Sequence, residues 1–249
     1  MKRYFVFLFV VSVKIISRIF FRFEITWVDD RPLDDWKQVK VFACLNHTSL
    51  FEPLFLSAMP FHFLWHGSKH ALLPIADKTM DRPILGKVLQ FMAPDVVSIT
   101  RRKDETWDGF LHKMSDQTVV CLAPEGRMMR ANGLDSNGKP MSVRGGISDI
   151  LLHIHEGYFL FGYSGGLHHI QKPGEKFPKL FKTIRIRWEA VPIAEFKRDM
   201  PTENAREFKV AVVKNLNERM LRHSPISEGS VGPQSSILTS LRDETKCQT

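Results

Sequence analysis

The chain has 249 residues, 43% of them hydrophobic, so it can bury a sizeable core, and one principal domain is the simplest expectation. Lys and Arg outnumber Asp and Glu by 35 to 27, and this net charge of +8 favours an anionic partner. The basic residues are dispersed without a helix-turn-helix or RNA-binding signature, which argues against a nucleic-acid binder. The three cysteines are scattered and form no disulfide framework, so we expect a reducing compartment.

The N-terminal end predicts a membrane anchor. Tyr4 to Val13 is an apolar run, and Lys14, Arg18 and Arg22 follow at helical spacing, which predicts an amphipathic helix with a basic stripe. The run is too short to span a bilayer, and no Ala-x-Ala cleavage site follows it. We therefore expect residues 1–35 to form a peripheral or monotopic anchor on the cytoplasmic face, with the stripe on anionic lipid headgroups, in preference to a cleaved signal peptide.

Strand-like runs and amphipathic helical stretches alternate through the rest of the chain. Strands are expected at 38–45, 63–66, 95–100, 117–123, 158–163 and 184–194, and helices at 50–59, 83–92, 104–115, 146–155 and 206–222. This order predicts an α/β domain over residues 36–223, with a mixed, largely parallel sheet flanked by helices. Residues 224–249 are rich in Ser, Thr, Gly and Gln, and we expect them to be a disordered tail.

A histidine and a carboxylate five positions apart, His47 and Glu52, follow the strand expected at 38–45. Residues five apart on one α-helix point about 140° away from each other, so the two can meet only if His47 lies in the turn before a helix that begins near Glu52. The carboxylate would then fix the tautomer of a histidine that takes a proton from a hydroxyl nucleophile. Ser49 and Glu52 also match a capping box, a purely structural role for Glu52. The sequence leaves both interpretations open.

A basic pair follows the strand expected at 95–100. Arg101 and Arg102 could hold a phosphate through bidentate, charge-assisted hydrogen bonds. A solvated basic turn at a helix start is the alternative for two neighbouring arginines.

A third cluster follows the strand expected at 117–123. Glu125, Gly126 and Arg127 combine a carboxylate, a backbone that a ligand can approach closely, and a guanidinium. Because sites in open α/β sheets gather at the carboxyl ends of strands, we expect the three clusters to converge on His47.

These motifs together resemble the glycerolipid acyltransferase family, whose best-known members are the 1-acylglycerol-3-phosphate acyltransferases. The resemblance covers about residues 40–195, and its four motifs stand in the family's order: Asn46-His47 with Glu52, Ile99-Thr100-Arg101-Arg102, Ala123-Pro124-Glu125-Gly126, and Val191-Pro192-Ile193. Weaker landmarks are Lys69 with Leu72 and Pro74, and Arg144-Gly145-Gly146.

The resemblance implies an enzyme that moves an acyl chain from acyl-CoA or acyl carrier protein to the hydroxyl of a lysophospholipid, with 1-acylglycerol-3-phosphate as the first choice of acceptor. His47 would be the general base, and Glu52 would orient and charge it. The implied substrate-binding residues are Asn46, Lys69, Arg101, Arg102, Glu125, Gly126 and Arg127. The acyl thioester is a co-substrate, so the resemblance implies neither a cofactor nor a metal.

Two departures from the family pattern leave the acceptor open. Glu52 stands where the family usually has Asp, as glutamate does in the related lipid A late acyltransferases. Arg127 follows Pro-Glu-Gly directly, where Thr-Arg is more usual. A lipid A type acceptor and a non-catalytic membrane lipid-binding protein therefore stay as alternatives.

The remaining histidines suggest a weaker alternative, a metal-dependent hydrolase. Its ligands would be His153, His155 and Glu156, or the pair His168-His169. His153 and His155 lie on an expected helix, where residues two apart do not share a face. Paired surface histidines are the simpler interpretation.

Overall fold

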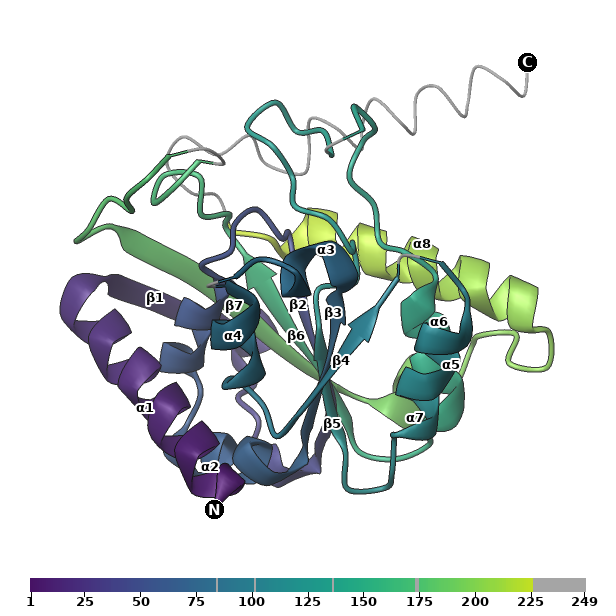
Figure 1. The fold of residues 1–249 in the computed structure, drawn as a ribbon. Helices are drawn as coiled ribbons and strands as arrows, with labels where there is room; N and C mark the ends of the chain where they lie inside the picture. The colour runs from purple at the N-terminus through teal and green to yellow at the C-terminus, as the bar shows by residue number, and fades with distance from the viewer. Residues whose placement is uncertain (84, 101, 136, 173–174, 226–249) are drawn as a thin grey trace.

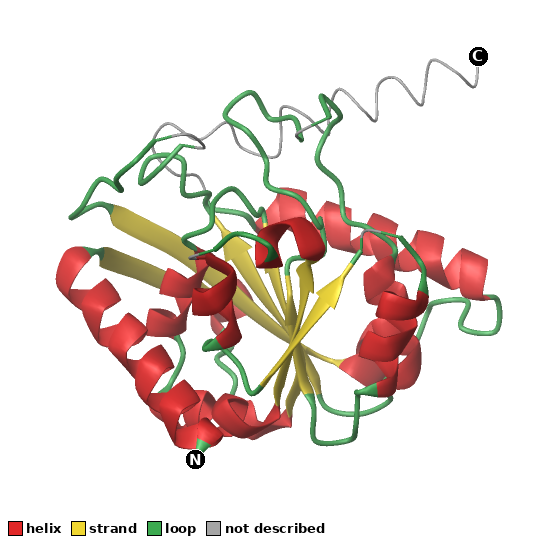
Figure 2. Cartoon of the chain, viewed as in Figure 1, coloured by secondary structure: helices red, strands yellow, loops and turns green. Residues whose placement is uncertain are grey.

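The computed structural model describes residues 1–83, 85–100, 102–135, 137–172 and 175–225. Within them, a seven-stranded sheet lies between two groups of helices (Figures 1 and 2). The strand order is β1-β7-β6-β2-β5-β3-β4, and every neighbouring pair is parallel except β6 with β7. The predicted mixed, largely parallel sheet flanked by helices is confirmed.

The elements have the following bounds. The strands are β1 (Arg22–Trp27), β2 (Val39–Leu45), β3 (Ala71–Ala76), β4 (Asp95–Ile99), β5 (Val119–Leu122), β6 (Tyr158–Ser164) and β7 (Thr183–Pro192). The α-helices are α1 (Lys2–Phe20), α2 (Phe61–His70), α3 (Asp77–Met80), α4 (Leu85–Gln90), α5 (Glu105–His112), α6 (Gly146–His153), α7 (Ile193–Lys197) and α8 (Ala205–His223). Short 3₁₀-helices are η1 (Val28–Asp30), η2 (Trp36–Gln38) and η3 (Glu52–Ala58).

Each face of the sheet has its own core. Alternate residues of β2 divide between the two, because successive strand side chains point to opposite faces. Val41, Ala43 and Leu45 pack with α5, α6 and α8, whereas Phe42 and Cys44 pack with α1, α2 and η3. Val39 joins the second group because the register of β2 shifts between Val39 and Val41. The molecule is therefore a three-layer α/β/α arrangement, with β2 at the centre of the sheet.

The strand directions define one functional edge. β2 to β6 all run the same way, so their carboxyl ends lie at the same edge of the sheet. β7 runs antiparallel to β6, and β1 runs parallel to β7, so both of these strands begin at that edge. The turns after β2 and β5, the connection from β6 to β7, and the link from α1 to β1 consequently all lie at this edge.

Two strands were not expected from the sequence. β1 lies within the segment 1–35 that we assigned to the anchor, and it pairs with β7 along its whole length. β3 contains Pro74, which has no N–H to donate. The structure accommodates it because the β5 ladder pairs with β3 only at Ala71 and Leu72, before Pro74 is reached.

The prediction of a strand at 63–66 was wrong, since these residues form part of α2. Phe63 and Leu64 are buried together with Ser68, and this spacing of four is a helical period rather than an alternation. The helix expected at 50–59 is the tighter η3, with i→i+3 hydrogen bonds from Leu54 N to Phe51 O and from Met59 N to Leu56 O. Pro residues at both ends confine this segment to a short piece, the usual length of a 3₁₀-helix.

The N-terminal helix α1 forms as predicted, but its basic stripe is not turned away from the protein. Lys14 Nζ donates to the carbonyls of Ser57 and Met59 at 2.7 Å each, and Arg18 Nη2 donates to Ser57 O at 3.0 Å. The last turn of a helix leaves carbonyls without intrahelical partners, and these two cations satisfy the carbonyls at the end of η3. Our placement of Lys14 and Arg18 on lipid headgroups is corrected accordingly.

The outer face of α1 is apolar instead. Val6 and Val10 are buried against the sheet side, and the exposed large apolar side chains of this helix are Tyr4, Phe5, Leu8, Ile15, Ile16 and Ile19. In the described part of the chain, no helix is both long enough and apolar enough to cross a bilayer.

Candidate active site

Two adjoining cavities lie where β3 and β5 end. One has a volume of about 480 Å³ and contains six cationic side chains, from Arg102, Lys103, Arg127, Lys139, Arg144 and Lys209. The other, of about 250 Å³, lies between the sheet and the helices α1, α2, α4 and η3, and its lining is almost entirely apolar. Pro74, Leu122 and Ala123 line both, so the two cavities meet at the carboxyl ends of these strands.

His47 lies in the turn after β2, at the polar end of the apolar cavity. The preceding residue, Asn46, has a φ of 67°, a left-handed conformation that asparagine adopts more readily than most residues. The Asn46 side chain donates from Nδ2 to Ser164 O at 2.8 Å, which ties this turn to the end of β6. Met129 N donates to His47 O at 2.8 Å from the other side. Asn46 therefore positions His47 through the backbone.

Glu52 unites the two roles that the sequence left open. Its Oε1 accepts the backbone N–H groups of Thr48 at 2.9 Å and Ser49 at 2.8 Å, which is half of the expected capping box. The same oxygen lies 3.2 Å from His47 Nδ1, an ion-pair distance when the histidine is protonated. The predicted His47–Glu52 contact and the structural role of Glu52 are therefore present together.

Glu125 joins the ends of β5 and β2. Its side chain is only 1% exposed, and its Oε1 accepts Asn46 N at 2.6 Å and His47 N at 3.4 Å. Burial raises the pKa of the Glu125 carboxyl above its ordinary value, and the charge of His47 and the backbone hydrogen bonds offset this only in part. Since Glu125 also lines the cationic cavity, it connects this cavity to the histidine turn.

The guanidinium of Arg127 is held by a residue that the sequence analysis missed. Arg127 Nη1 lies 3.2 Å from Asp135 Oδ2, and Arg144 Nη2 lies 3.7 Å from the same oxygen. Asp135 Oδ1 meanwhile accepts the N–H groups of Asn137 and Lys139, at 2.7 and 3.0 Å. A signal did exist, because an Asp two residues before an Asn-Gly pair is typical of a turn that the carboxylate closes.

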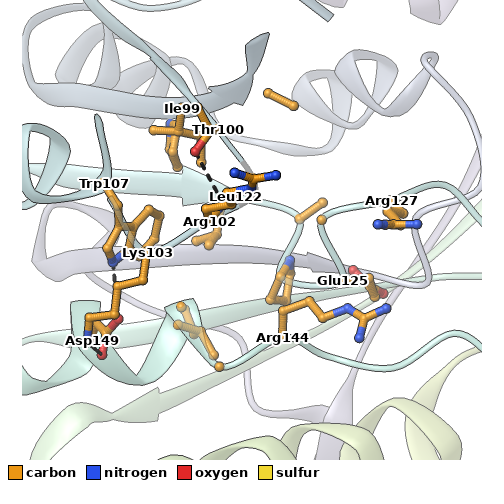
Figure 3. A pocket seen from close by; sticks show the side chains of 18 of the residues that line it. Ile99, Thr100, Arg102, Lys103, Trp107, Leu122, Glu125, Arg127, Arg144 and Asp149 are labelled. Carbon is orange, nitrogen blue, oxygen red and sulfur yellow. Dashed lines mark hydrogen bonds and ion pairs between the residues drawn. The ribbon is translucent and has the colours of Figure 1, made fainter. Parts of the chain in front are cut away.

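Burial by itself raises the pKa of Asp135, but its carboxyl has a pKa below the ordinary value. The backbone N–H groups of Lys139 and Asn137 and the charges of Arg127 and Arg144 produce this net lowering. Figure 3 shows the guanidinium groups of Arg102, Arg127 and Arg144 together with the Glu125 carboxylate. Asp135 stays ionised at neutral pH and fixes two of the three guanidinium groups, so the cavity is organised for an anion.

The other predicted substrate-binding residues have different outcomes. Gly126 adopts a φ of 65° directly after Glu125, which a glycine takes without strain. Arg102 lines the cationic cavity, whereas Arg101 lies outside the described residues. Lys69 is exposed in the last turn of α2, which leads into the start of β3, so it lies at the opposite edge of the sheet. The structure does not bring Lys69 to the site.

Three of the four histidines considered as metal ligands make backbone contacts. His168 is buried, with Nε2 2.8 Å from Met129 O, and His169 Nε2 lies 2.8 Å from Thr183 O. His153 Nδ1 is 2.8 Å from Asp149 O in its own helix. Over the described ranges, no three His, Cys, Asp or Glu side chains gather as a metal site would require.

Comparisons with known proteins agree with this architecture. No family model and no curated protein matches the sequence. Among solved structures, the 1-acyl-sn-glycerophosphate (LPA) acyltransferase PlsC from Thermotoga maritima matches with a TM-score of 0.54 and 16% identity, over 88% of this chain and 81% of that chain. The chain therefore has the fold of that acyltransferase.

Proposed function

We propose that this chain is a membrane-associated O-acyltransferase that moves an acyl chain from an acyl thioester to the hydroxyl of a lysophospholipid. The observation that carries the proposal is the position of the His47–Glu52 pair between the two cavities. His47 lines the apolar cavity, and its backbone N–H is bound by Glu125, which lines the cationic one. The first cavity suits an acyl chain and the second suits an anionic headgroup.

The proposed step is a direct transfer. The imidazole of His47 takes the proton of the acceptor hydroxyl while the hydroxyl oxygen forms a bond to the thioester carbonyl carbon. The carbon–sulfur bond then breaks, and the leaving thiolate receives the proton from the imidazolium. The Glu52 carboxylate, 3.2 Å from Nδ1, favours the charged histidine during this step. The thioester is a co-substrate, and no cofactor is part of the proposal.

We take 1-acylglycerol-3-phosphate as the acceptor. Arg102, Arg127 and Arg144 offer guanidinium groups, which bind phosphate oxygens in a bidentate manner. Arg101 belongs to the same proposal by its place in the sequence. The Thermotoga maritima protein that shares this fold is a 1-acyl-sn-glycerophosphate (LPA) acyltransferase, whose acceptor belongs to the same class. The donor is acyl-CoA or the acidic acyl carrier protein, and both suit a chain with a net charge of +8.

Membrane association is proposed to depend on the outer face of α1. Its exposed apolar side chains would insert among the acyl chains, with the helix lying in the plane of the cytoplasmic face. Anionic lipids would add attraction to the net positive charge. Such binding would bring the enzyme to an acceptor that itself resides in the bilayer.

The test is a product analysis with three full-length proteins: wild type, His47→Ala and the control His155→Ala. Each is given acyl-CoA or acyl-carrier-protein thioester together with a panel of lysophospholipids, and products are identified by mass spectrometry. We expect a new acylated phospholipid from the wild type and from His155→Ala, since His155 is an exposed residue outside both cavities. His47→Ala should form none.

Two results would overturn the proposal. Full turnover by His47→Ala would remove His47 as the general base. No product from folded, vesicle-bound wild type would remove the lysophospholipid acceptor, and the same panel extended with lipid A precursors would then separate the lipid A type of acceptor from a non-catalytic lipid-binding protein.

A further inference from the structure

The connection between β6 and β7 presents an exposed apolar cluster that the proposed mechanism does not use. Phe177 is 82% exposed, Phe181 is 64% exposed and Leu180 is 43% exposed. These three side chains come from eight consecutive residues, 175–182, at the edge of the sheet where His47 lies. Large apolar side chains gathered on one exposed segment are typical of an interaction surface.

The segment is held in a defined position next to α1. Phe181 N donates to Phe20 O at 2.7 Å, Arg22 N donates to Lys182 O at 3.0 Å, and the rings of Phe20 and Phe181 lie 6.2 Å apart. Phe181 has a φ of 60°, a left-handed conformation that is rare for a bulky residue. Lys179 N donates a further hydrogen bond to Ile170 O at 2.8 Å. The exposed aromatic residues therefore project from a structured element.

The cluster continues the apolar face of α1. Ile15, Ile16 and Ile19 are each more than half exposed in the last turns of this helix, and Phe20, which follows them, contacts Phe181. Figure 1 shows the connection beside the upper end of α1 and the start of β1. The two apolar surfaces thus meet at the edge of the sheet that holds the site.

Charge identifies the kind of partner. Lys176, Lys179 and Lys182 are exposed among the apolar residues, and Glu175 is the sole acidic residue of the segment. Glu175 lies 3.5 Å from Lys179 Nζ, so Lys176 and Lys182 add a net positive charge beside Phe177 and Phe181. Exposed aromatic side chains interleaved with lysines suit the headgroup region of an anionic bilayer, where the rings insert and the ammonium groups stay at the phosphates.

We propose that residues 175–182 form a second membrane-binding element, which inserts Phe177, Leu180 and Phe181 into an anionic bilayer beside α1. The inference rests on the proposed membrane association and goes beyond it. A single surface helix leaves the molecule able to roll about the helix axis. A second contact, on the far side of Phe20, fixes that rotation and holds the edge with His47 towards the lipids.

The test uses full-length protein and vesicles of phosphatidylcholine with phosphatidylglycerol, in a sedimentation assay that needs no turnover. Phe177→Ser removes the most exposed ring of the segment, and its high exposure leaves the core untouched. We expect a roughly tenfold weaker partition coefficient, since burial of a Phe side chain is a large apolar transfer. The matched control is Val210→Ser, because Val210 is 62% exposed on α8, on the other face of the sheet, and should leave binding unchanged.

A second variant tests the charge. Lys176→Gln with Lys182→Gln should weaken binding to the anionic vesicles by at least tenfold at low salt and leave binding to pure phosphatidylcholine unaltered. Unchanged binding of both variants would overturn the proposal. A change in oligomeric state of Phe177→Ser at unchanged vesicle binding would overturn it in favour of a protein partner.

Activity measurements distinguish a failure of this inference from a failure of the proposed function. If the wild type acylates a lysophospholipid, Phe177→Ser should lose turnover on vesicle-bound acceptor and keep it on a short-chain, water-soluble acceptor. If no variant shows turnover, the vesicle-binding result still decides whether residues 175–182 bind the bilayer.

Discussion

Glu52 Oε1 caps the turn after His47 and also lies 3.2 Å from His47 Nδ1. Glu52→Gln keeps an oxygen for the N–H groups of Thr48 and Ser49 but removes the charge, so we expect a fall in kcat/KM on the order of 100-fold with little change in stability. Glu52→Ala removes the cap as well and should lower the free energy of unfolding by about 1 kcal/mol. Steady-state kinetics and urea denaturation of both variants check this. Full activity of Glu52→Gln would leave Glu52 as a cap alone.

The raised pKa of Glu125 predicts how the stability of the protein depends on pH. A carboxyl with a raised pKa in the folded state binds more protons when folded than when unfolded, so its contribution to the free energy of unfolding falls as pH rises through that pKa. Glu125→Gln preserves an acceptor for Asn46 N and His47 N and cannot ionise. We therefore expect its stability relative to wild type to increase over the interval from about pH 4, the ordinary range of a glutamate carboxyl, up through the raised pKa of Glu125. The measurement is urea denaturation of both proteins across this range.

A second variant measures how much the hydrogen bonds accepted by Glu125 contribute to the free energy of unfolding. Glu125→Ala leaves the buried N–H of Asn46 without an acceptor, so it should be about 1–3 kcal/mol less stable than Glu125→Gln at every pH. A stability difference between wild type and Glu125→Gln that stays constant with pH would contradict the raised pKa of the carboxyl.

At the residue scale, the sequence predicted the site better than it predicted the residues that support it. The spacing of His47 and Glu52 allowed only the strand–turn–helix geometry that the structure shows. Asp135 was missed because its partners are distant along an irregular loop: Arg127 lies eight positions before it and Arg144 nine positions after it. Lys69 was assigned by resemblance alone, and no strand-end argument supported it.

At the scale of elements, the buried strands were the predictable ones. β2, β5 and β6 are predominantly apolar runs that follow directly from the sequence, and the buried residues of α8 recur at every fourth position. β1 does carry a strand signal, the polar–apolar alternation of RFEITW, but the assignment of residues 1–35 to the anchor overlooked it, and β3 contains a proline. Their place in the sheet depends on partners distant in sequence, which local pattern does not reveal.

The two faces of α1 make a prediction with an internal control. Leu8 is 61% exposed on the outer face, so Leu8→Ser should weaken vesicle binding about tenfold and leave the thermal unfolding temperature unchanged. Val6 is buried, so Val6→Ser should instead destabilise the fold by about 2 kcal/mol. Vesicle sedimentation and thermal unfolding of both variants separate the two faces. Equal vesicle binding of Leu8→Ser and wild type would refute the proposed role of this helix in anchoring.

At the scale of the whole molecule, the sheet separates two cavities of different chemistry. The cationic cavity includes residues of α5, α6 and α8, and the apolar cavity lies under α1, α2 and α4. They adjoin where β3 and β5 end, so a reaction centre there can hold a charged headgroup and an acyl chain without mixing their environments. This division follows from the three-layer fold, because each cavity uses the helices of one layer.

The apolar cavity predicts a limit to the acyl chain. It extends along β5 from Ala123, near the site, to Val119, a distance of about 13 Å for four residues of strand. Gly67 of α2 lines it, and a Cβ at this position would meet only the Ala71 Cβ, at 4.0 Å. Gly67→Leu should therefore fill part of the cavity without disturbing the helix, in which leucine is a better former than glycine.

Each methylene excluded from the cavity loses about 0.8 kcal/mol of binding, which is about fourfold in kcat/KM. Gly67→Leu should accordingly lower kcat/KM for long-chain donors by tenfold or more and preserve it for short-chain donors. The matched control is Gly109→Leu on the exposed side of α5, where an added Cβ meets nothing within 4 Å. Competition between donors of different length, read by mass spectrometry, gives the result. An unaltered chain-length profile would place the acyl chain outside this cavity.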